Sequence, residues 1–483
     1  MLRGVARVFF STGNAPAIIE LQMTYEESVR YLLSLGRELA SPQQARAVKF
    51  DLANITALCE QLGHPERAFQ SVHVAGTNGK GSTAAMLDSI LRAAGLRTGL
   101  FTSPHLERIN ERIRLDGKDI SDADFAATFT RLRRVIEESL AAGHLAAHPS
   151  FFECMTALAF DYFAQAGAEF AVFEVGMGGR LDATNVLLPE VAVITQVDFD
   201  HENYLGHSIE EIAAEKAGII KPGARVVSAA EHLVARMVIR RRAAAQAAFL
   251  VEIETAFHLE DFSMGPSRAF TVVDEQSGTR IRLELPLAGR FQVRNALTAL
   301  AAARLLAERG APIDDEAIAR GIATTKWPGR LERVAERPEI YLDGMHNPAA
   351  AREVAAYWES ELAGRNIFLV YGALRDKAVD EIAGLLFPRA AAVILTAPAQ
   401  PRSISAPVLA EMTGHHAQRL EVFPDPRRAL ERALELATPA DVIFVAGSLY
   451  LVGDLRRYWN SRMAGAAESS QSAFRQGSAR QPG

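Results

Sequence analysis

The strongest structural signal in this chain is Ser71-Val-His-Val-Ala-Gly-Thr-Asn-Gly-Lys-Gly-Ser-Thr83. A short apolar run of strand type leads into three glycines and a lysine, and a helical pattern follows. Glycines permit the tight turn that brings backbone N–H groups close to an anion, and the positive end of a helix dipole favours the same anion. The stretch therefore predicts a phosphate-binding loop between a buried strand and a helix, with Lys80 neutralising the outer phosphates.

The spacing within this loop departs from the common nucleotide-binding pattern. That pattern has four residues between its first glycine and the Gly-Lys pair, with Ser or Thr directly after the lysine. Here only Thr77 and Asn78 separate the glycines, and Gly81 follows Lys80. An ordinary strand-to-helix turn is the alternative interpretation. A lysine between glycines after an apolar strand has little packing purpose, which favours the phosphate loop.

Residues 76–82 read Gly-Thr-Asn-Gly-Lys-Gly-Ser, and this spacing resembles the loop of the Mur ligase superfamily. With the added glycine before the serine, the loop is similar to that of the folate branch of this superfamily, folylpolyglutamate synthase/dihydrofolate synthase. The resemblance runs from Met23 to about Arg462 through several motifs in the same order. It implies an α/β fold with a P-loop, parallel-sheet ATP-binding N-terminal domain and a smaller Rossmann-like α/β C-terminal domain. The implied ATP contacts in the loop are Thr77, Asn78, Gly79, Lys80, Gly81 and Ser82, of which Lys80 is also catalytic.

Composition limits the classes of protein to which the chain can belong. Its 483 residues are 49% apolar, enough for cores in two or three domains. With 52 Lys and Arg against 58 Asp and Glu, the net charge is −6, so no general basic field favours nucleic acid or an anionic membrane. The 2 cysteines suit a reducing compartment. No apolar run reaches the roughly 18 residues of a membrane span. We expect a cytoplasmic monomer without nucleic-acid or membrane partners.

Pattern changes along the chain predict the domain limits. An amphipathic helix begins near Met23, Pro328 and Gly329 interrupt a helical pattern, and the last residues are mostly Ala, Ser, Gln and Gly. The predicted divisions are an extension or misassigned start at 1–22, an ATP-binding domain at 23–324, a C-terminal glutamate-ligase domain at 331–462 and a disordered tail at 463–483.

Two predicted strands end in candidate metal ligands. Ser103 follows the strand at 98–102, and Glu174 ends the buried strand that begins at Ala171. Burying an unpaired carboxylate is costly, and beside a phosphate loop its natural partner is Mg²⁺, which prefers hard oxygen ligands. A plain Ser-Pro turn, and an ion pair between Glu174 and Arg180, are the alternative interpretations.

His201 and Lys216 complete the predicted metal site. His201 follows the apolar strand at 191–197, and Lys216 lies in Glu-Lys-Ala-Gly-Ile. A lone histidine is usually structural, and a helix lysine is usually solvated and a poor metal ligand. In the superfamily, however, this lysine is commonly carbamylated by CO₂. The resemblance thus implies a catalytic, carbamylated Lys216 that binds Mg²⁺ with Ser103, Glu174 and His201, and it allows a monovalent cation as a further cofactor.

The remaining site residues are also implied by the resemblance. The stretch from Gly178 to Asn185 corresponds to the folate side of the cleft. Asn295 corresponds to an ATP contact, although Phe291 stands where the family often has histidine. The predicted second sheet carries the other contacts in the turns that follow its strands. The resemblance assigns Arg180 and Asp182 to folate binding. It assigns Asn295, Arg330 and Asp343 to ATP binding. It assigns Ser448 and a catalytic His346 to glutamate binding.

Together these motifs predict an ATP-dependent amide ligase. A carboxylate is a poor acyl donor, so ATP would first phosphorylate a pteroate or folate carboxylate, and the amine of L-glutamate would attack the acyl phosphate. The implied partners are ATP, L-glutamate and dihydropteroate or a reduced folate. The competing hypotheses are a Mur-type cell-wall ligase, a nucleotide-dependent switch and a non-catalytic nucleotide-binding module. Gly81 in Gly79-Lys-Gly-Ser82 favours the folate branch over a Mur-type cell-wall ligase.

Overall fold

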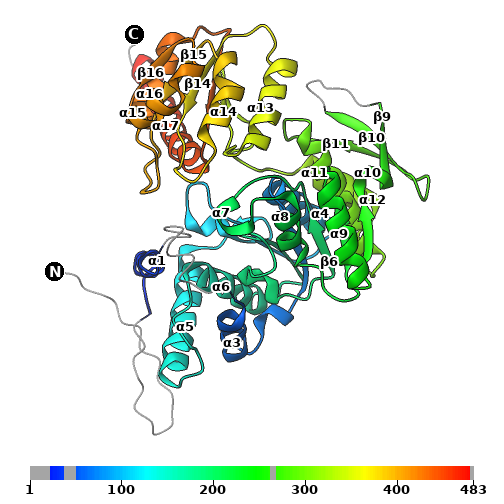
Figure 1. The fold of residues 1–483 in the computed structure, drawn as a ribbon. Helices are drawn as coiled ribbons and strands as arrows, with labels where there is room; N and C mark the ends of the chain where they lie inside the picture. Colours follow the sequence, from blue (N-terminus) through cyan, green and yellow to red (C-terminus); the bar gives the residue numbers. More distant parts are fainter. Residues whose placement is uncertain (1–21, 37–50, 262–267, 479–483) are drawn as a thin grey trace, which may run out of the picture.

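The computed structural model describes residues 22–36, 51–261 and 268–478, without the side chains of 465–478 (Figure 1). All but the last residue of the predicted extension at 1–22 lies outside this range. The first described helix, α1 (Tyr25–Ser34), begins where the sequence predicts it. Its start is fixed by a capping box, in which the Thr24 side chain accepts from the Glu27 N–H and the Glu27 carboxylate accepts from the Thr24 N–H.

An eight-stranded sheet forms the centre of the N-terminal domain, in the order β4-β3-β2-β5-β1-β6-β7-β8. The six strands from β2 to β8 in this order are parallel, as the buried apolar runs predict, and the β3–β4 hairpin adds an antiparallel edge. The strands are β1 (Gln70–Ala75), β2 (Thr98–Phe101), β3 (Ile113–Leu115), β4 (Lys118–Asp119), β5 (Phe170–Glu174), β6 (Val191–Ile194), β7 (Arg225–Ser228) and β8 (Phe249–Glu252).

Helices cover both faces of this sheet because successive strand residues point to opposite sides. Val72 and Val74 of β1 belong to one core with α4, α11 and α12, whereas Phe173 of β5 belongs to another with α1, α3, α5 and α6. Ala75 and Ile194 join a third core with α8 and α9.

The remaining helices of this domain are α3 (Ala53–Gln61), α4 (Lys80–Ala93), α5 (Asp122–Ala141), α6 (Phe151–Gln165), α7 (Glu202–Leu205), α8 (Ile209–Ala217), α9 (Leu233–Ala245), α10 (Ile253–Ala256), α11 (Phe291–Ala307) and α12 (Asp315–Ala323), with 3-10 turns η1 (Pro65–Arg67), η2 (Ile109–Arg112) and η3 (Ala183–Val186).

A small antiparallel sheet extends from the same domain beside α11 and α12 (Figure 1). It consists of β9 (Phe257–Glu260), β10 (Ala269–Asp274) and β11 (Arg280–Glu284). The sequence pattern predicts strands at the second and third of these positions. The alternating side chains Phe270, Val272 and Leu283 are buried against the first core, which explains why these segments form strands.

The C-terminal domain is a second, six-stranded sheet in the order β12-β13-β17-β14-β15-β16, parallel except at β12. Its helices lie on both sides, and in Figure 1 the domain sits above the N-terminal domain. Its elements are β12 (Glu332–Glu336), β13 (Glu339–Leu342), α13 (Pro348–Glu361), β14 (Ile367–Tyr371), α14 (Val379–Leu386), η4 (Phe387–Arg389), β15 (Ala392–Leu395), α15 (Ala406–Thr413), η5 (Gly414–His416), β16 (Leu420–Val422), α16 (Pro426–Leu436), β17 (Val442–Ala446) and α17 (Leu449–Ser478).

The last helix differs from the sequence expectation. A disordered tail is predicted from Met463, but α17 continues to Ser478. The segment contains several Ala, Glu, Gln and Arg residues, which favour a helix although they offer little apolar surface to bury. Composition alone therefore did not predict that the helix continues through this segment. The last five residues, 479–483, lie outside the described range.

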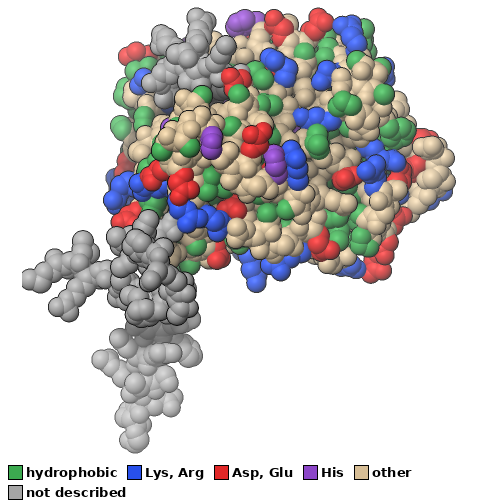
Figure 2. All heavy atoms as spheres, turned by 90° about the horizontal axis from the view of Figure 1, so that it is seen from below, with side chains coloured by type: hydrophobic (Ala, Val, Ile, Leu, Met, Phe, Trp, Pro, Cys, Tyr) green, Lys and Arg blue, Asp and Glu red, His purple; other side chains and the backbone are tan. Residues whose placement is uncertain are grey.

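The surface agrees with the small net charge. On the face in Figure 2, acidic and basic side chains are interspersed. None of the helices in the described part of the chain is long and apolar enough to cross a membrane.

Candidate active site

Both domains line one cavity of about 680 Å³, which we call the interdomain cavity. The N-terminal domain contributes the phosphate loop (residues 76–82) and the residues that follow β2, β5 and β6. The C-terminal domain contributes Arg330 and the turn after β13, from Asp343 to His346. The carboxyl ends of parallel strands therefore face the cavity from both sheets, the usual position of ligands in open α/β sheets.

The phosphate loop has the geometry of an anion-binding turn. Gly79 has a φ of 88° and immediately precedes α4, which begins at Lys80. A Cβ atom at Gly79 would lie 2.4 Å from Oδ1 of Asn295, so the left-handed backbone and the close approach both require glycine. The N-terminus of α4 thus opens toward the cavity with its free N–H groups.

Hydrogen bonds from neighbouring segments hold this loop in place. The Thr77 hydroxyl donates to the carbonyl of Asp198 at 2.9 Å, and the Thr195 hydroxyl donates to the carbonyl of Asn78 at 2.7 Å. Nζ of Lys80 donates to the carbonyls of Gly76 and Thr77 at 3.1 and 3.2 Å. The donors are therefore positioned before a ligand binds, which lowers the reorganisation needed during a reaction.

Lys216 lies beneath the same loop. Its side chain is 3% exposed, and its Nζ donates to the Gly76 carbonyl at 2.9 Å, so Lys80 and Lys216 share that acceptor. Burial, together with the nearby charge of Lys80, lowers the pKa of Lys216 from 10.5 to about 7. Near neutral pH a large fraction of Lys216 is therefore an uncharged amine, the form that reacts with CO₂.

Glu174 ends β5 at the cavity and is 5% exposed. One carboxylate oxygen accepts from the backbone N–H of Ser103 at 3.1 Å. Burial raises the pKa of Glu174, and the charge of Lys80 and the Ser103 hydrogen bond partly offset this effect. Arg180 is not its partner, because the Arg180 guanidinium pairs with Glu215 at 2.8 Å.

His201 lines the cavity next to the start of α7 and adopts a left-handed conformation with φ of 54°. Burial and the positive charge of Lys377 lower its pKa to about 3. The imidazole is consequently neutral at physiological pH and retains a nitrogen lone pair for a metal ion.

The donor set fits a divalent metal only when other oxygens contribute. Among the described residues, neither Glu174 nor His201 belongs to a group of three carboxylate, imidazole or thiol ligands whose ligand atoms lie within 4.8 Å of one another. Ser103, phosphate oxygens and a carbamate on Lys216 would supply hard oxygen ligands of the kind that Mg²⁺ prefers. As an ammonium, Lys216 would instead repel the ion. The fit thus depends on modification of the lysine.

In the C-terminal domain, Asp343 fixes the turn that faces the nucleotide loop. Its buried carboxylate accepts from the backbone N–H groups of Leu331 and Met345 at 2.8 and 2.9 Å. Burial raises its pKa, and the charge of Arg330 opposes the shift. Nδ1 of His346, which lines the cavity, donates to the Gly344 carbonyl at 2.9 Å, and Nε2 lies 3.6 Å from the Asp200 carboxylate.

Asp200 joins the two domains beside His201. Lys377 donates to its carboxylate at 2.8 Å and Asn347 at 3.2 Å, while Nε2 of His346 lies 3.6 Å away. Burial alone would raise the pKa of Asp200, but the hydrogen bond with His346 and the charge of Lys377 outweigh it and hold the pKa well below its usual range. Asp200 is therefore an anion with a side chain only 9% exposed, and it contacts three C-terminal residues, of which His346 lines the cavity.

The phosphate loop also contacts the C-terminal domain directly. Asn78 and Asn347 exchange side-chain hydrogen bonds of 2.9 and 3.2 Å. Asn347 is in addition the N-cap of α13, since its side chain accepts from the Ala350 N–H. One amide therefore links the loop, the second domain and the start of a helix.

Family models match both halves of the chain: the Mur ligase middle domain over residues 74–303 and the Mur ligase glutamate ligase domain over residues 329–449. Dihydrofolate synthase/folylpolyglutamate synthase of Bacillus subtilis (strain 168) is 38% identical over 415 residues, covering 85% of this chain and 95% of the relative. The chain belongs to this family. The prediction from the loop and motif order is thereby confirmed.

Solved structures of the family agree with the fold. E. coli FolC in complex with DHPP and ADP has a TM-score of 0.79 and 28% identity, covering 90% of this chain and 98% of that one. A bifunctional folylpolyglutamate synthase/dihydrofolate synthase with Mn, AMPPNP and L-glutamate bound has a TM-score of 0.77 and 31% identity, covering 91% and 98%. The predicted Mur ligase-like α/β architecture is confirmed.

Most predicted site residues of this family member lie in the interdomain cavity. The residues that line it are Thr77, Asn78, Gly79, Lys80, Gly81, Ser82, Ser103, Glu174, His201, Lys216, Asn295, Arg330, Asp343 and His346. Nδ2 of Asn295 donates to Gln292 at 2.9 Å, and Gln292 donates to the Ser82 hydroxyl at 3.3 Å. This chain of side chains explains how a helix distant in sequence reaches the loop.

Three predicted substrate residues do not line the cavity. Arg180 is bound to Glu215, and the Asp182 carboxylate accepts from the N–H groups of Met177 and Thr184 at the start of η3. Ser448 is buried, and its hydroxyl accepts from the Tyr450 N–H. Their substrate roles remain predictions for which these contacts offer no support.

The interdomain contacts of Asp200, Asn347 and Lys377 were not predicted from the sequence. Asp200 and Asn347 are neighbours of the predicted site residues His201 and His346, whereas Lys377 has no predicted site residue beside it. All three lie in turns that follow a strand of a parallel sheet, which is the one signal that they share.

Proposed function

We propose that this protein is an ATP-dependent ligase that joins L-glutamate to dihydropteroate, to the γ-carboxylate of a reduced folate, or to both. The observation that carries the proposal is the interdomain cavity, where a phosphate loop with Lys80 meets C-terminal residues that include His346. A switch or binding module needs the nucleotide loop alone. A ligase needs nucleotide, acid and amine side by side.

The nucleotide would lie along the N-terminal wall of the cavity. The loop N–H groups and Lys80 would hold the phosphates, and Asn295 and Arg330 would contact the nucleotide. The apolar side chains Ile253, Phe257 and Phe291 line another part of the cavity and offer a surface for the adenine ring. Phe291 thus supplies an aromatic face where a polar contact is usual in the family.

We further propose Mg²⁺ as the divalent ion, held by Ser103, Glu174, His201 and carbamylated Lys216. When bound, the ion neutralises charge on the phosphate oxygens during transfer. Glu174 and His201 would orient it, and the Lys216 carbamate would replace the repulsive ammonium with an anion. Glu174 is the one carboxylate in this proposed set, and a carbamate on Lys216, beneath the phosphate loop, would add a second anionic oxygen ligand, which supports the modification.

The chemistry then proceeds in two steps. The acid's carboxylate oxygen attacks the γ-phosphorus, the bond to the bridging oxygen breaks, and ADP leaves. The glutamate amine next attacks the acyl carbon, phosphate leaves with the former carboxylate oxygen, and the amine loses a proton. Lys80 and the loop donors stabilise charge in the first step, and His346 would orient glutamate for the second.

Contacts across the cavity would keep water from the acyl phosphate. Asp200 with Lys377, and Asn78 with Asn347, connect the domains at the cavity wall. Their release would open the site for exchange of substrate and product. We retain the proposed domain limits, 23–324 and 331–462, because these contacts lie between two separate sheets.

An ADP-release assay tests the proposal. ADP should accumulate only when a pteroate-type acid and L-glutamate are both present, and the assay should be run separately with dihydropteroate and tetrahydrofolate. Lys80→Ala provides the background rate. Equal ATP hydrolysis without the acid would indicate a switch, and binding without hydrolysis would indicate a nucleotide-binding module. Turnover with tetrahydrofolate alone would limit the enzyme to polyglutamylation.

A further inference from the structure

We propose that Asp380, His415 and His416 form a surface site for Zn²⁺ or a similar borderline transition-metal ion on the C-terminal domain. Among the described residues this is the one group of three carboxylate, imidazole or thiol ligands whose ligand atoms all lie within 4.8 Å of one another. None of the three residues lines the interdomain cavity. The site is therefore separate from the proposed catalytic metal.

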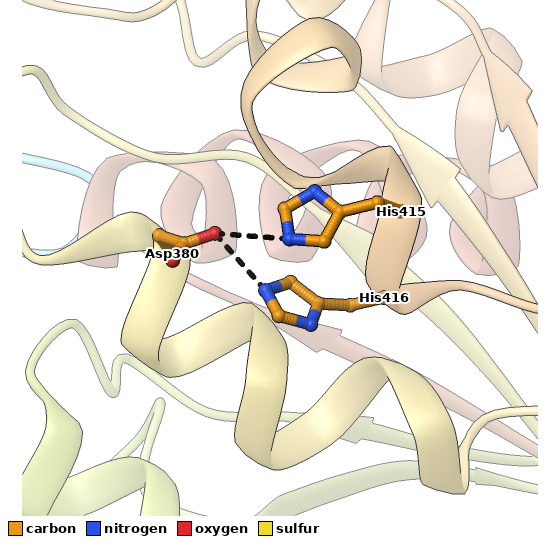
Figure 3. Close-up of side chains that lie close together, drawn as sticks. All are labelled: Asp380, His415 and His416. Carbon is orange, nitrogen blue, oxygen red and sulfur yellow. Dashed lines mark hydrogen bonds and ion pairs between the residues drawn. The ribbon is translucent and has the colours of Figure 1, made fainter.

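Adjacent histidines converge on one carboxylate because of the backbone between them. His415 and His416 end the 3-10 turn η5, and Figure 3 shows both rings directed at Asp380 on α14. Nε2 of His416 lies 3.0 Å from Oδ1 of Asp380, and Nε2 of His415 lies 3.6 Å from the same atom. In an extended strand, neighbouring side chains would instead point to opposite sides.

These separations match a tetrahedral zinc site. With Zn–N and Zn–O bonds of about 2.0–2.1 Å, two ligand atoms of a tetrahedral ion are about 3.3 Å apart. The observed 3.0 and 3.6 Å bracket that value, so small side-chain rotations suffice. Two imidazoles and one carboxylate leave a fourth position for water. Nitrogen ligands favour zinc-like ions over Mg²⁺ or Ca²⁺, which prefer oxygen.

A simple ion pair explains the arrangement less completely. One carboxylate neutralises one imidazolium, whereas here two rings lie with centroids 3.9 Å apart against a single Asp380. The adjacent carboxylate of Glu381 is already paired with Arg352 at 2.8 Å. Protonating both histidines would place two like charges side by side. A metal ion instead uses the lone pairs of both neutral rings and the negative charge together.

The ring of His416 packs against α14. A Cβ atom at Gly384 would lie in ordinary van der Waals contact with it, 3.4 Å from Cε1 of His416. His416 is consequently one-quarter exposed, compared with 62% for His415. An ion here would tie η5 to the first turn of α14. Asp380 in that turn lies three residues after Lys377, which contacts Asp200. We infer a stabilising role for the ion in that part of the domain.

Zinc titration of the full chain without a histidine tag tests the site. Isothermal titration with Zn²⁺ in excess Mg²⁺ should give one saturable site per chain, and Co²⁺ should give the visible absorption of a tetrahedral complex. His415→Ala, His416→Ala and Asp380→Asn should each weaken Zn²⁺ binding by about tenfold or more. Zn²⁺ should raise the thermal unfolding midpoint of the wild type but not of these variants.

Two controls separate this site from other sources of binding. His258→Ala removes another exposed histidine, which contacts the carboxylates of Glu260 and Glu275 but belongs to no three-ligand group in the described part of the chain. This variant should bind Zn²⁺ as the wild type does. His201→Ala removes a proposed catalytic ligand and should also retain the site.

Absence of saturable binding, or binding that survives all three substitutions, would overturn the proposal. Loss of the ion in His201→Ala would do the same, because it would place the ion in the interdomain cavity. Matching far-ultraviolet circular dichroism of the metal-free proteins excludes misfolding as the cause, and Asp380→Asn keeps the side-chain size.

Discussion

Replacement of Lys216 by methionine should stabilise the metal-free protein and at the same time abolish most ligase activity. Methionine keeps an unbranched side chain of similar length but carries neither the buried charge nor an amine for CO₂. An ordinary helix lysine would give the opposite pattern, with unchanged catalysis and a small change in stability. Stability and activity should thus change in opposite directions only if Lys216 is the buried, modified residue proposed here.

The size of both effects follows from the pKa. Lowering the pKa of Lys216 from 10.5 to about 7 corresponds to about 4 kcal/mol of unfavourable charge burial at pH 7. Loss of the hydrogen bond to Gly76 offsets about 1 kcal/mol, so a net gain of roughly 2–3 kcal/mol is expected. The same shift makes about half of the amine neutral at pH 7, compared with about one part in 3,000 at the ordinary pKa.

The pH dependence gives an independent check. Between pH 7 and 10.5 the unfolded chain holds a proton on Lys216 that the folded chain has released, so the stability of the wild type rises with pH across this window. The methionine variant lacks that rise, and its advantage should shrink as the pH increases. Below pH 7 the neutral amine disappears, and wild-type activity should fall unless bicarbonate is added.

Urea denaturation of both proteins in CO₂-depleted, metal-free buffer measures the stability difference, and ADP release measures activity. Lys216→Ala, tested with and without short carboxylic acids, is the matched variant, because a small acid can occupy the vacated space and restore the missing oxygens. An active Lys216→Met enzyme would refute the proposed role. A less stable variant would refute the account of charge burial.

Three further substitutions test other parts of the structure. Lys80→Ala should lower kcat by about 100-fold or more, because it removes a charge that stabilises the transferring phosphoryl group. The circular dichroism spectrum should stay unchanged. Near-normal turnover would place the nucleotide elsewhere. Lys377→Ala leaves the buried Asp200 without its closest cation and should cost about 3 kcal/mol or more in domain association, seen as faster limited proteolysis between the domains; unchanged proteolysis would contradict the contact. Thr184→Val removes a buried hydroxyl that donates to Asp182 and should lower the unfolding free energy by about 2 kcal/mol in urea, whereas a neutral result would mean that Asp182 needs no such partner.

The sequence predicted the parts of the fold that repeat a simple local rule. Buried apolar strands followed by glycines, the helix near Met23 and the helix after the glycine loop are visible in the pattern because side-chain periodicity and capping are local. The carboxyl ends of parallel strands then bring Ser103, Glu174 and His201 to one edge. No knowledge of long-range contacts was needed for that step.

Long-range pairing could not be predicted in the same way. Lys377 and Asp200 are 177 positions apart, and nothing near either residue indicates the other. Likewise, Arg180 could pair with several carboxylates, and only the fold selects Glu215 rather than Glu174. The sequence around His415 and His416 likewise does not predict that both rings lie beside Asp380, because the backbone of η5 sets their direction.

The most direct test of the proposed reaction follows the oxygen of the acceptor acid. A pteroate or folate labelled with heavy oxygen in the reacting carboxylate is incubated with ATP, L-glutamate and the enzyme, and the released phosphate is analysed by mass spectrometry. Ligation through an acyl phosphate predicts one heavy oxygen in each phosphate, with product one glutamate longer. Unlabelled phosphate together with the ligated product would contradict this mechanism.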